Sequence, residues 1–437
     1  MLYLRSLGAR GFQGKRFGTM IISSTALKRL RANVPAITLG AGLGILGVRP
    51  ADYTAFLDGK NILTINSHAP GITFLSNHSY VIAGVLLLAY ASITLRRFPR
   101  VQIGWSTACV CILFGWIWLR SFVEAKVGIT GIAEFGGGIV ALLIAASGSP
   151  RVNLSGTFIA GSIFLLLNAY ECLVGGGGWW QGRMYGITGH PNHLGATAVA
   201  FAIICLMRIF DQGTVKTKIL RAAVSAGLIL LILNSGSRTA MLSLASALVI
   251  LATCTTGTAG SRIRRVAVGI ACLSVVIVLF RSPAPLSDPL GGGFDRGNTR
   301  QEAWSVMIST ISENPVLGTG ITKGYVESSY LLAWIRGGLP AFLLLAGSVV
   351  FMWSGCFQGR KCLIGMTCLC TASALITMGF FEGTLLDKFS PITLVFGMML
   401  AAGDRARRAG SYDNAAQAKR PPHLSRPERS TASLLPS

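Results

Sequence analysis

The stretch Gly182–Ala196, GRMYGITGHPNHLGA, separates two long apolar runs, one at residues 156–175 and the other beginning at residue 194. It holds one arginine, two histidines and one asparagine. A transmembrane helix needs about 20 consecutive, mostly apolar residues, and both flanking runs approach that length. The pattern therefore predicts two membrane helices, with a polar cluster at the surface where the chain re-enters the bilayer.

Apolar runs of this kind recur along almost the whole chain of 437 residues, which is 51% hydrophobic and only 13% charged. This composition is typical of polytopic membrane proteins and unusual for soluble ones. The 53 glycines also suit close contacts between helices in lipid. We predict an all-α polytopic membrane protein with about twelve transmembrane helices, near residues 33–49, 74–95, 101–119, 127–147, 156–175, 194–210, 219–234, 240–254, 264–280, 329–354, 362–381 and 389–403.

The basic residues are distributed unevenly between alternate connecting segments. If the N-terminus is cytoplasmic, the inner segments hold most of the 39 Lys and Arg residues and few of the 16 acidic residues. Cytoplasmic segments of membrane proteins carry such a basic excess. We therefore predict a basic cytoplasmic tail at 1–32, a transmembrane domain at 33–403 that includes an extracytoplasmic loop at 281–328 between helices nine and ten, and a disordered cytoplasmic tail at 404–437.

The net charge of +23 is then a signal of topology and of contact with anionic membrane lipids. We expect no nucleic-acid partner, because no binding motif accompanies the charge. The ten cysteines lie mostly inside apolar runs, which indicates small core residues and not a disulfide framework. The first 32 residues are basic and lack the apolar core of a cleavable signal peptide.

Two polar stretches on the predicted outer face come directly before membrane helices. His190, Pro191 and Asn192 open one helix, and Ser237 and Arg238 open another. Serine is a favourable helix cap, and proline is favoured in the first turn. The unpaired N–H groups of a helix start bind anions, and a guanidinium binds phosphate oxygens with two parallel hydrogen bonds. We infer an anionic, diphosphate-containing ligand bound by Asn192, Ser237 and Arg238.

Less specific interpretations of these residues remain open. Arg183 and Arg238 could anchor helix ends at lipid headgroups, and Asn192 could serve only as a cap. His190 and His193 are three residues apart and could share a metal on one helix face. No third ligand is evident in the sequence, so we predict no metal and no cofactor.

The long loop contains GNTRQEAWSVMISTISENPVLGTG, residues 297–320. Thr299 followed by Glu302 matches a capping box, and apolar residues then recur at spacings of three and four. This predicts a short amphipathic helix that ends at Glu313, with Arg300 in its first turn available to an anion. Farther on, Glu327 opens the next membrane helix, where it could act as a helix cap or as a general base.

The ordered set GITGHPNHLG, SGSRTA, NTRQEAWSVMISTISENPVLGTG and ESSYLLAWIRGGLPAFLL resembles the bacterial O-antigen ligase and polymerase superfamily. The resemblance covers roughly residues 182–345. It implies a GT-C-like glycosyltransferase of the bacterial inner membrane, multi-pass, without metal or cofactor. Such an enzyme transfers a glycan from an undecaprenyl-diphosphate donor to a glycan acceptor at the outer face.

The resemblance also implies roles for individual residues. Arg238 and Arg300, and less securely Arg183, match the family arginines that bind the diphosphate, and Tyr330 is expected to contact the substrate. Ligases of the family carry a His-Asn pair where this chain has Glu327 and the residues after it. This difference favours a polymerase of O-antigen or exopolysaccharide repeats over a ligase that transfers the glycan to lipid A core. Glu327 is then the expected base, with His190 in reserve.

The implied chemistry is attack by an acceptor sugar hydroxyl on the anomeric carbon of the donor, with lipid diphosphate as the leaving group. A chain-length regulator and a flippase are the expected partners. The alternative from another class is a membrane transporter or flippase. It predicts an internal repeat and paired charges or broken helices near the membrane centre. The sequence shows no convincing repeat, and its charges gather at one face.

Overall fold

The computed structural model describes residues 24–49, 68–97, 103–123, 136, 138–139, 142–175, 178–180, 183–255, 299–320, 327–386 and 390–418. The chain divides into two compact units, Met1–Val34 and Pro35–Ser437. The division falls inside helix α1 (Ser24–Leu46) at Pro35, where a proline removes one helical hydrogen bond. All contacts below lie within the second unit. Most of the predicted N-terminal tail, the predicted helix at 264–280, parts of the loop 281–328, and residues 419–437 lie outside the described residues.

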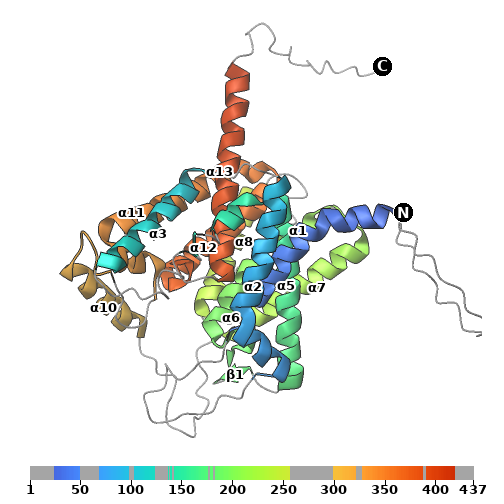
Figure 1. Cartoon of the computed structure of the whole chain (residues 1–437), viewed down its shortest axis with the longest axis horizontal. Helices are drawn as coiled ribbons and strands as arrows, with labels where there is room; N and C mark the ends of the chain where they lie inside the picture. Colours follow the sequence, from blue (N-terminus) through green and yellow to red (C-terminus); the bar gives the residue numbers. More distant parts are fainter. Residues whose placement is uncertain are drawn as a thin grey trace, which may run out of the picture. The chain divides into compact units, whose positions relative to one another are not determined.

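Helices account for most of the described chain (Figure 1). They begin where the sequence supplies caps: Ser149 before one helix, Thr214 before another, and Ser237 before a third, each accepting a backbone N–H of the first turn. After α1 the long helices are α2 (Pro70–Arg97), α3 (Trp105–Val123), α5 (Pro150–Tyr170), α6 (Pro191–Met207), α7 (Val215–Ser235), α8 (Arg238–Cys254), α10 (Thr299–Glu313), α11 (Ser329–Gln358), α12 (Leu363–Phe381) and α13 (Pro391–Ala418).

Short elements join several of these helices. A π-helical turn, η1 (Glu171–Gly175), extends α5 and is followed by a small antiparallel hairpin, β1 (Trp179–Trp180) and β2 (Arg183–Met184). The remaining short elements are the 3-10 turns η2 (Gly186–Thr188), η3 (Arg208–Phe210), η4 (Gly359–Lys361) and η5 (Gly383–Leu386).

Within the described part of the chain, six helices are long and apolar enough to cross a membrane. They support an all-α polytopic membrane protein, whereas the number of about twelve spans and the position of the large loop stay predictions. Two shorter apolar helices, Ala32–Leu46 and Arg238–Cys254, also coincide with predicted spans. The six long segments are Pro70–Arg96, Trp105–Val123, Pro150–Gly175, Pro191–Phe210, Ser329–Lys361 and Leu363–Phe381.

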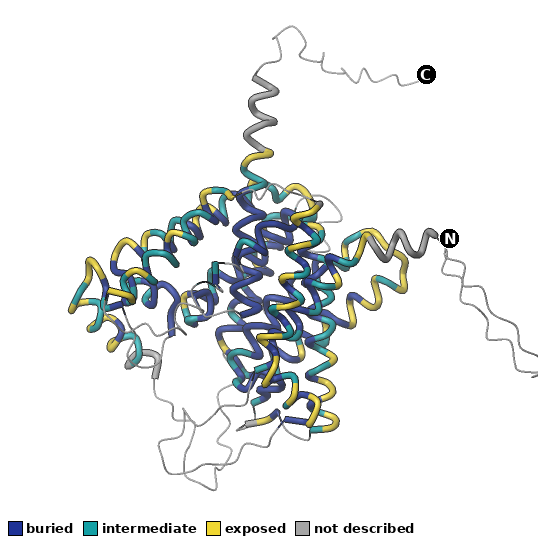
Figure 2. The backbone as a smooth tube through the Cα atoms, viewed as in Figure 1, coloured by how far each residue is buried: buried dark blue, intermediate teal, exposed yellow. Residues whose placement is uncertain are grey.

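The core of the second unit lies around α6 and α12, whose residues are mostly buried (Figure 2). By contrast, α2 exposes the large apolar side chains of Val81, Val85 and Leu88 at spacings of three and four residues. An apolar stripe of this kind on an outer helix suits contact with lipid tails and would be costly in water. The pattern of burial is therefore that of a membrane helix bundle.

Helix α13 continues past Asp404, where the sequence analysis placed the start of a disordered tail, as far as Ala418. Asp404 is buried and caps α3: its two carboxylate oxygens accept from the backbone N–H and hydroxyl groups of Ser106 and Thr107, at 2.6–3.2 Å. The sequence could not indicate this contact, because its partners are almost 300 positions apart. Helix α13 thus continues through residues 404–418, where the sequence analysis expected a disordered tail.

Helix α11 is broken at Gly338, which adopts φ 69° and ψ −164° ahead of Pro340. A side chain at Gly338 would collide with the carbonyl of Val316, so this crossing requires glycine. Two carbonyls next to the break are bonded: Gly337 accepts from the Trp116 indole at 2.6 Å, and Ile335 accepts from the Thr319 N–H at 2.7 Å. These two carbonyls are thus engaged by other parts of the protein.

Candidate functional site

The polar stretch that opened the sequence analysis forms a tightly held turn before α6. The β1–β2 hairpin positions Arg183, and the backbone N–H of Ile187 donates to the Asn168 side chain at 3.2 Å. Gly186 has φ 51°, and a Cβ there would overlap the Asn168 oxygen. His190 then caps α6, because its Nδ1 accepts from the Asn192 N–H at 3.1 Å. The helix starts at Pro191, as the sequence predicts.

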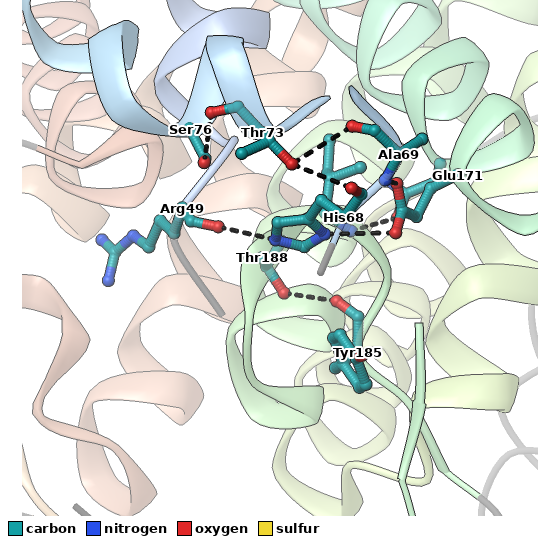
Figure 3. Close-up of polar contacts among 10 residues, drawn as sticks. Arg49, His68, Ala69, Thr73, Ser76, Glu171, Tyr185 and Thr188 are labelled. Carbon is teal, nitrogen blue, oxygen red and sulfur yellow. Dashed lines mark hydrogen bonds and ion pairs between the residues drawn. The ribbon is translucent and has the colours of Figure 1, made fainter. Parts of the chain in front are cut away.

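A buried pair, His68 and Glu171, lies next to this turn (Figure 3). The His68 ring lies between the Glu171 carboxylate, 3.2 Å from its Nδ1, and the Arg49 carbonyl, 3.1 Å from its Nε2. Glu171 is fully buried and also accepts from the Ala69 N–H at 3.1 Å. The Arg49 N–H in turn donates to the Ile187 carbonyl at 2.9 Å. The pair therefore links the end of α1, the start of α2 and the end of α5 to the turn.

Tyr185 belongs to the same turn, and its ring lies 6.5 Å from that of His68. Burial raises the pKa of the Tyr185 phenol above its ordinary value, and the charge of Glu171 adds a smaller rise. The group is therefore neutral at physiological pH and serves as a packing and hydrogen-bonding residue.

Arg183 joins the end of α7 to the start of α6. Its Nε donates to the Ser235 carbonyl at 2.9 Å, and its Nη2 donates to the Asn192 side-chain oxygen at 2.8 Å. Gly236 ends α7 in the left-handed conformation, with φ 59°. Both partners of Arg183 are protein groups at the two helix ends, so the structure gives it a bridging position and not that of an isolated headgroup anchor.

The next residues carry α8 into the bundle. Ser237 is buried and caps α8 by accepting from the Ala240 N–H at 3.3 Å. Its hydroxyl is thus engaged in capping. Arg238 is the first helical residue, is exposed, and makes no hydrogen bond or ion pair with the residues that the structure describes. The guanidinium therefore extends from a helix start, where the N–H dipoles already favour an anion.

At the start of α11 the structure separates two neighbouring roles. Ser328 is the cap, because its hydroxyl accepts from the Leu331 N–H at 3.4 Å. Glu327 comes one residue earlier and is 8% exposed. Tyr330 is the second residue of α11. Its ring is tilted over that of Phe380, with centroids 4.6 Å apart, and its hydroxyl bonds to no residue that the structure describes. The first turn of α11 therefore has its cap without Glu327.

Glu382, at the end of α12, brings these helix starts together. Its Oε1 accepts from the Asn192 amide and from the Thr239 hydroxyl, each at 3.2 Å. Its backbone carbonyl accepts from the N–H of Ser329 at 3.1 Å and from the Ser329 hydroxyl at 2.8 Å. These bonds place the starts of α6, α8 and α11 at one end of the bundle. The sequence analysis assigned Glu382 no role.

Helix α10 lies against the same end. Trp304 stacks on Phe381, with ring centroids 6.3 Å apart and an interplanar angle of 17°. Arg300 lies one turn before Trp304 in α10, whose predicted end at Glu313 is confirmed. Of the apolar residues in this helix, Met307 is buried, as expected for an amphipathic helix. Ile308 is exposed.

The site residues predicted from the sequence thus fall into two groups. Asn192 and Arg183 are joined by a hydrogen bond, and His190 caps the same helix. Ser237, Arg238, Glu327 and Tyr330 lie at helix starts that Glu382 joins to this group through its bonds to Thr239 and Ser329. The rings of His190 and His193 are 5.6 Å apart, but the described residues contain no cluster of three or more His, Cys, Asp or Glu that could hold a metal.

Residues 222–346 match the family model described as O-antigen ligase. Over these residues the chain is similar to the O-antigen ligase and polymerase superfamily, which supports the resemblance seen in the sequence. The matched segment covers most of α7, all of α8 and α10, and rather more than the first half of α11. It includes Arg238, Arg300, Glu327 and Tyr330. The family consists of glycosyltransferase-like membrane enzymes that use lipid-linked glycans. No curated protein matches the chain.

Proposed function

We propose that the protein polymerises lipid-diphosphate-linked oligosaccharide repeats on the outer face of the bacterial inner membrane. The observation that carries the proposal is the meeting of three helix starts around Glu382, with the exposed Arg238 on one and the buried Glu327 before another. Two arginines, Arg183 and Arg238, lie at the same end of the bundle. Helix starts and guanidinium groups together suit a diphosphate whose negative charge grows as it leaves.

In the proposed reaction the acceptor hydroxyl attacks the anomeric carbon, and the bond from that carbon to the diphosphate oxygen breaks. Arg238 and Arg300 hold the leaving diphosphate, and Glu327 takes the hydroxyl proton. His190 is the weaker candidate for this step, because its Nδ1 lone pair already accepts from Asn192. A neutral imidazole in that tautomer carries its proton on Nε2 and can donate there but not accept.

A ligase that transfers the glycan to lipid A core is the second candidate within the family. Purified protein in nanodiscs should decide between the two when given an undecaprenyl-diphosphate-linked repeat. A ladder of lipid-linked products longer than one repeat supports the polymerase. Transfer of the glycan only to added lipid A core supports the ligase, and no transfer in either reaction rejects both.

The transporter alternative predicted broken helices, and α11 is broken at Gly338. In transporters, such breaks expose backbone groups that bind the cargo. Here the Gly337 and Ile335 carbonyls at the break accept from Trp116 and Thr319, so they are engaged within the protein. This favours the enzyme over the transporter.

The proposed reaction requires that the arginine-bearing helix starts face outward. We expect a cysteine substituted for Asp295, in the predicted outer loop, to react with an impermeant maleimide in intact spheroplasts. A cysteine substituted for Ser411 should react only after the membrane is permeabilised. The native cysteines are first replaced, and total labelling in detergent is the control. Labelling of position 411 in intact spheroplasts would reverse the orientation and reject the outer-face reaction.

A further inference from the structure

We propose that Glu382 is a positioning residue for the donor diphosphate: through Asn192 it orients the Arg183 guanidinium, and through Thr239 it fixes the first turn of α8. The inference rests on the proposed diphosphate donor and adds a residue that neither the sequence motifs nor the matched segment 222–346 includes.

In the hydrogen bonds that join Arg183, Asn192 and Glu382, each group can take only one role, as donor or as acceptor. A guanidinium only donates, and an ionised carboxylate only accepts. The Asn192 oxygen must therefore face Arg183, and its amide N–H must face Glu382, as found at 2.8 Å and 3.2 Å. The orientation of the Asn192 amide is set by its two charged neighbours, so the carboxylate of Glu382 determines where Asn192 holds Arg183.

The second branch reaches Arg238. Thr239 is 1% exposed and donates its hydroxyl to the same Oε1 of Glu382. Because Arg238 and Thr239 are adjacent in the first turn of α8, this bond sets the position of the backbone from which Arg238 extends. Glu382 is 7% exposed, and charge-assisted hydrogen bonds in such a poorly solvated position are strong.

Glu382 acts through its neighbours and not on the reacting atoms. Its Oε1 already accepts two hydrogen bonds, and its backbone carbonyl accepts two more from Ser329. The bonds to Asn192, Thr239 and Ser329 hold three helix starts in one arrangement. A residue with this role should change donor binding when its hydrogen-bond pattern is altered, and a compensating change should restore it.

A reciprocal swap tests this role. Asn192→Asp places a second carboxylate opposite Glu382 and removes the donated N–H, so two acceptors face each other. We expect the Kd for undecaprenyl diphosphate in nanodiscs and the donor KM to rise at least about tenfold, the loss expected of one charge-assisted hydrogen bond.

The double variant Asn192→Asp/Glu382→Gln exchanges the amide and the carboxylate between the two positions. The new amide at position 382 can donate to the new carboxylate at position 192, which still accepts from Arg183. We expect Kd and KM to return to within about threefold of the native values, because the two positions are coupled.

The matched control is Asp211→Asn, an acid-to-amide change beyond the other end of α6. Asp211 pairs with Arg208 at 3.3 Å and is partly exposed, so its loss should leave Kd and KM unchanged. The temperature of thermal unfolding is measured for every variant. The double variant should recover this temperature as well as donor binding.

Native-like binding by Asn192→Asp, or no recovery of binding or folding in the double variant, overturns the role of Glu382. If the swap restores undecaprenyl diphosphate binding but the native protein transfers no glycan, the inference stands and the proposed polymerase fails. If the native protein transfers glycan but the swap does not restore binding, the proposed polymerase stands and the role of Glu382 fails. A native protein that does not bind the lipid diphosphate overturns both.

Discussion

Glu327→Gln should fold, bind the lipid-linked donor and extend it about 10²–10⁴-fold more slowly than the native protein, the usual range for losing a general base. Glutamine preserves the size and hydrogen-bonding capacity of the side chain but cannot take the proton of the attacking hydroxyl. The measurement is single-turnover extension of a purified lipid-linked repeat in nanodiscs, with donor binding measured in parallel.

The structure sharpens this prediction by removing the simplest alternative role of Glu327. If Glu327 capped α11, its replacement by glutamine would cost well under about 1 kcal/mol and would scarcely change the rate. The capping hydroxyl belongs to Ser328, and Glu327 is a separate, buried carboxylate. A large kinetic effect without loss of stability therefore indicates participation in the reaction.

The control for Glu327→Gln is Glu313→Gln, the same change at the exposed last residue of α10. It should extend the repeat at the native rate. Near-native turnover by Glu327→Gln would contradict the assignment of the base. Restoration of turnover by an added small carboxylate in Glu327→Ala would in turn support it.

The sequence predicted those features of the fold that depend on neighbouring residues. Apolar runs marked the helices, and Pro191 and Ser237 marked two helix starts at their observed positions. The end of α10 at Glu313 followed from Asn314 and Pro315. Each of these signals is local, since capping and hydrophobic periodicity act within one or two helical turns.

The contacts that assemble the site are long-range, and the sequence could not indicate them. Glu382 contacts Asn192 and Thr239 across 190 and 143 positions of the chain, and a single sequence contains no signal for such pairs. Glu171 lies in the apolar run 156–175, and its partner, His68, is 103 positions away. The sequence therefore predicted which residues are polar at this end of the bundle and could not predict which of them hold one another.

Arg183 illustrates the difference. Its sequence position at the edge of an apolar run allowed either a phosphate ligand or a headgroup anchor. The structure instead joins it to Ser235 and Asn192. If Arg183 binds the diphosphate, it does so with a guanidinium that protein groups already orient. Arg238 is exposed and has no such partner among the described residues.

Arg238→Lys should therefore leave the fold unchanged and lower glycan transfer about 10²-fold, the order seen when one stabilising donor is removed. The exposed side chain makes no hydrogen bond with the described residues, so no hydrogen bond to them is lost. Lysine retains the positive charge but lacks the planar pair of N–H groups that binds two phosphate oxygens at once. The loss should appear both in the Kd for undecaprenyl diphosphate and in the rate of transfer.

Arg300→Ala should cause a comparable loss, and the double variant Arg238→Lys/Arg300→Ala should lose less than the product of the two if both side chains bind one diphosphate. Arg96→Lys, at an exposed arginine near the end of α2, is the matched control and should transfer glycan normally. Normal transfer by Arg238→Lys would reduce Arg238 to an anchor at the membrane surface. Fully multiplicative losses would instead place Arg238 and Arg300 on separate parts of the substrate, because only groups that share a ligand compensate for each other's absence.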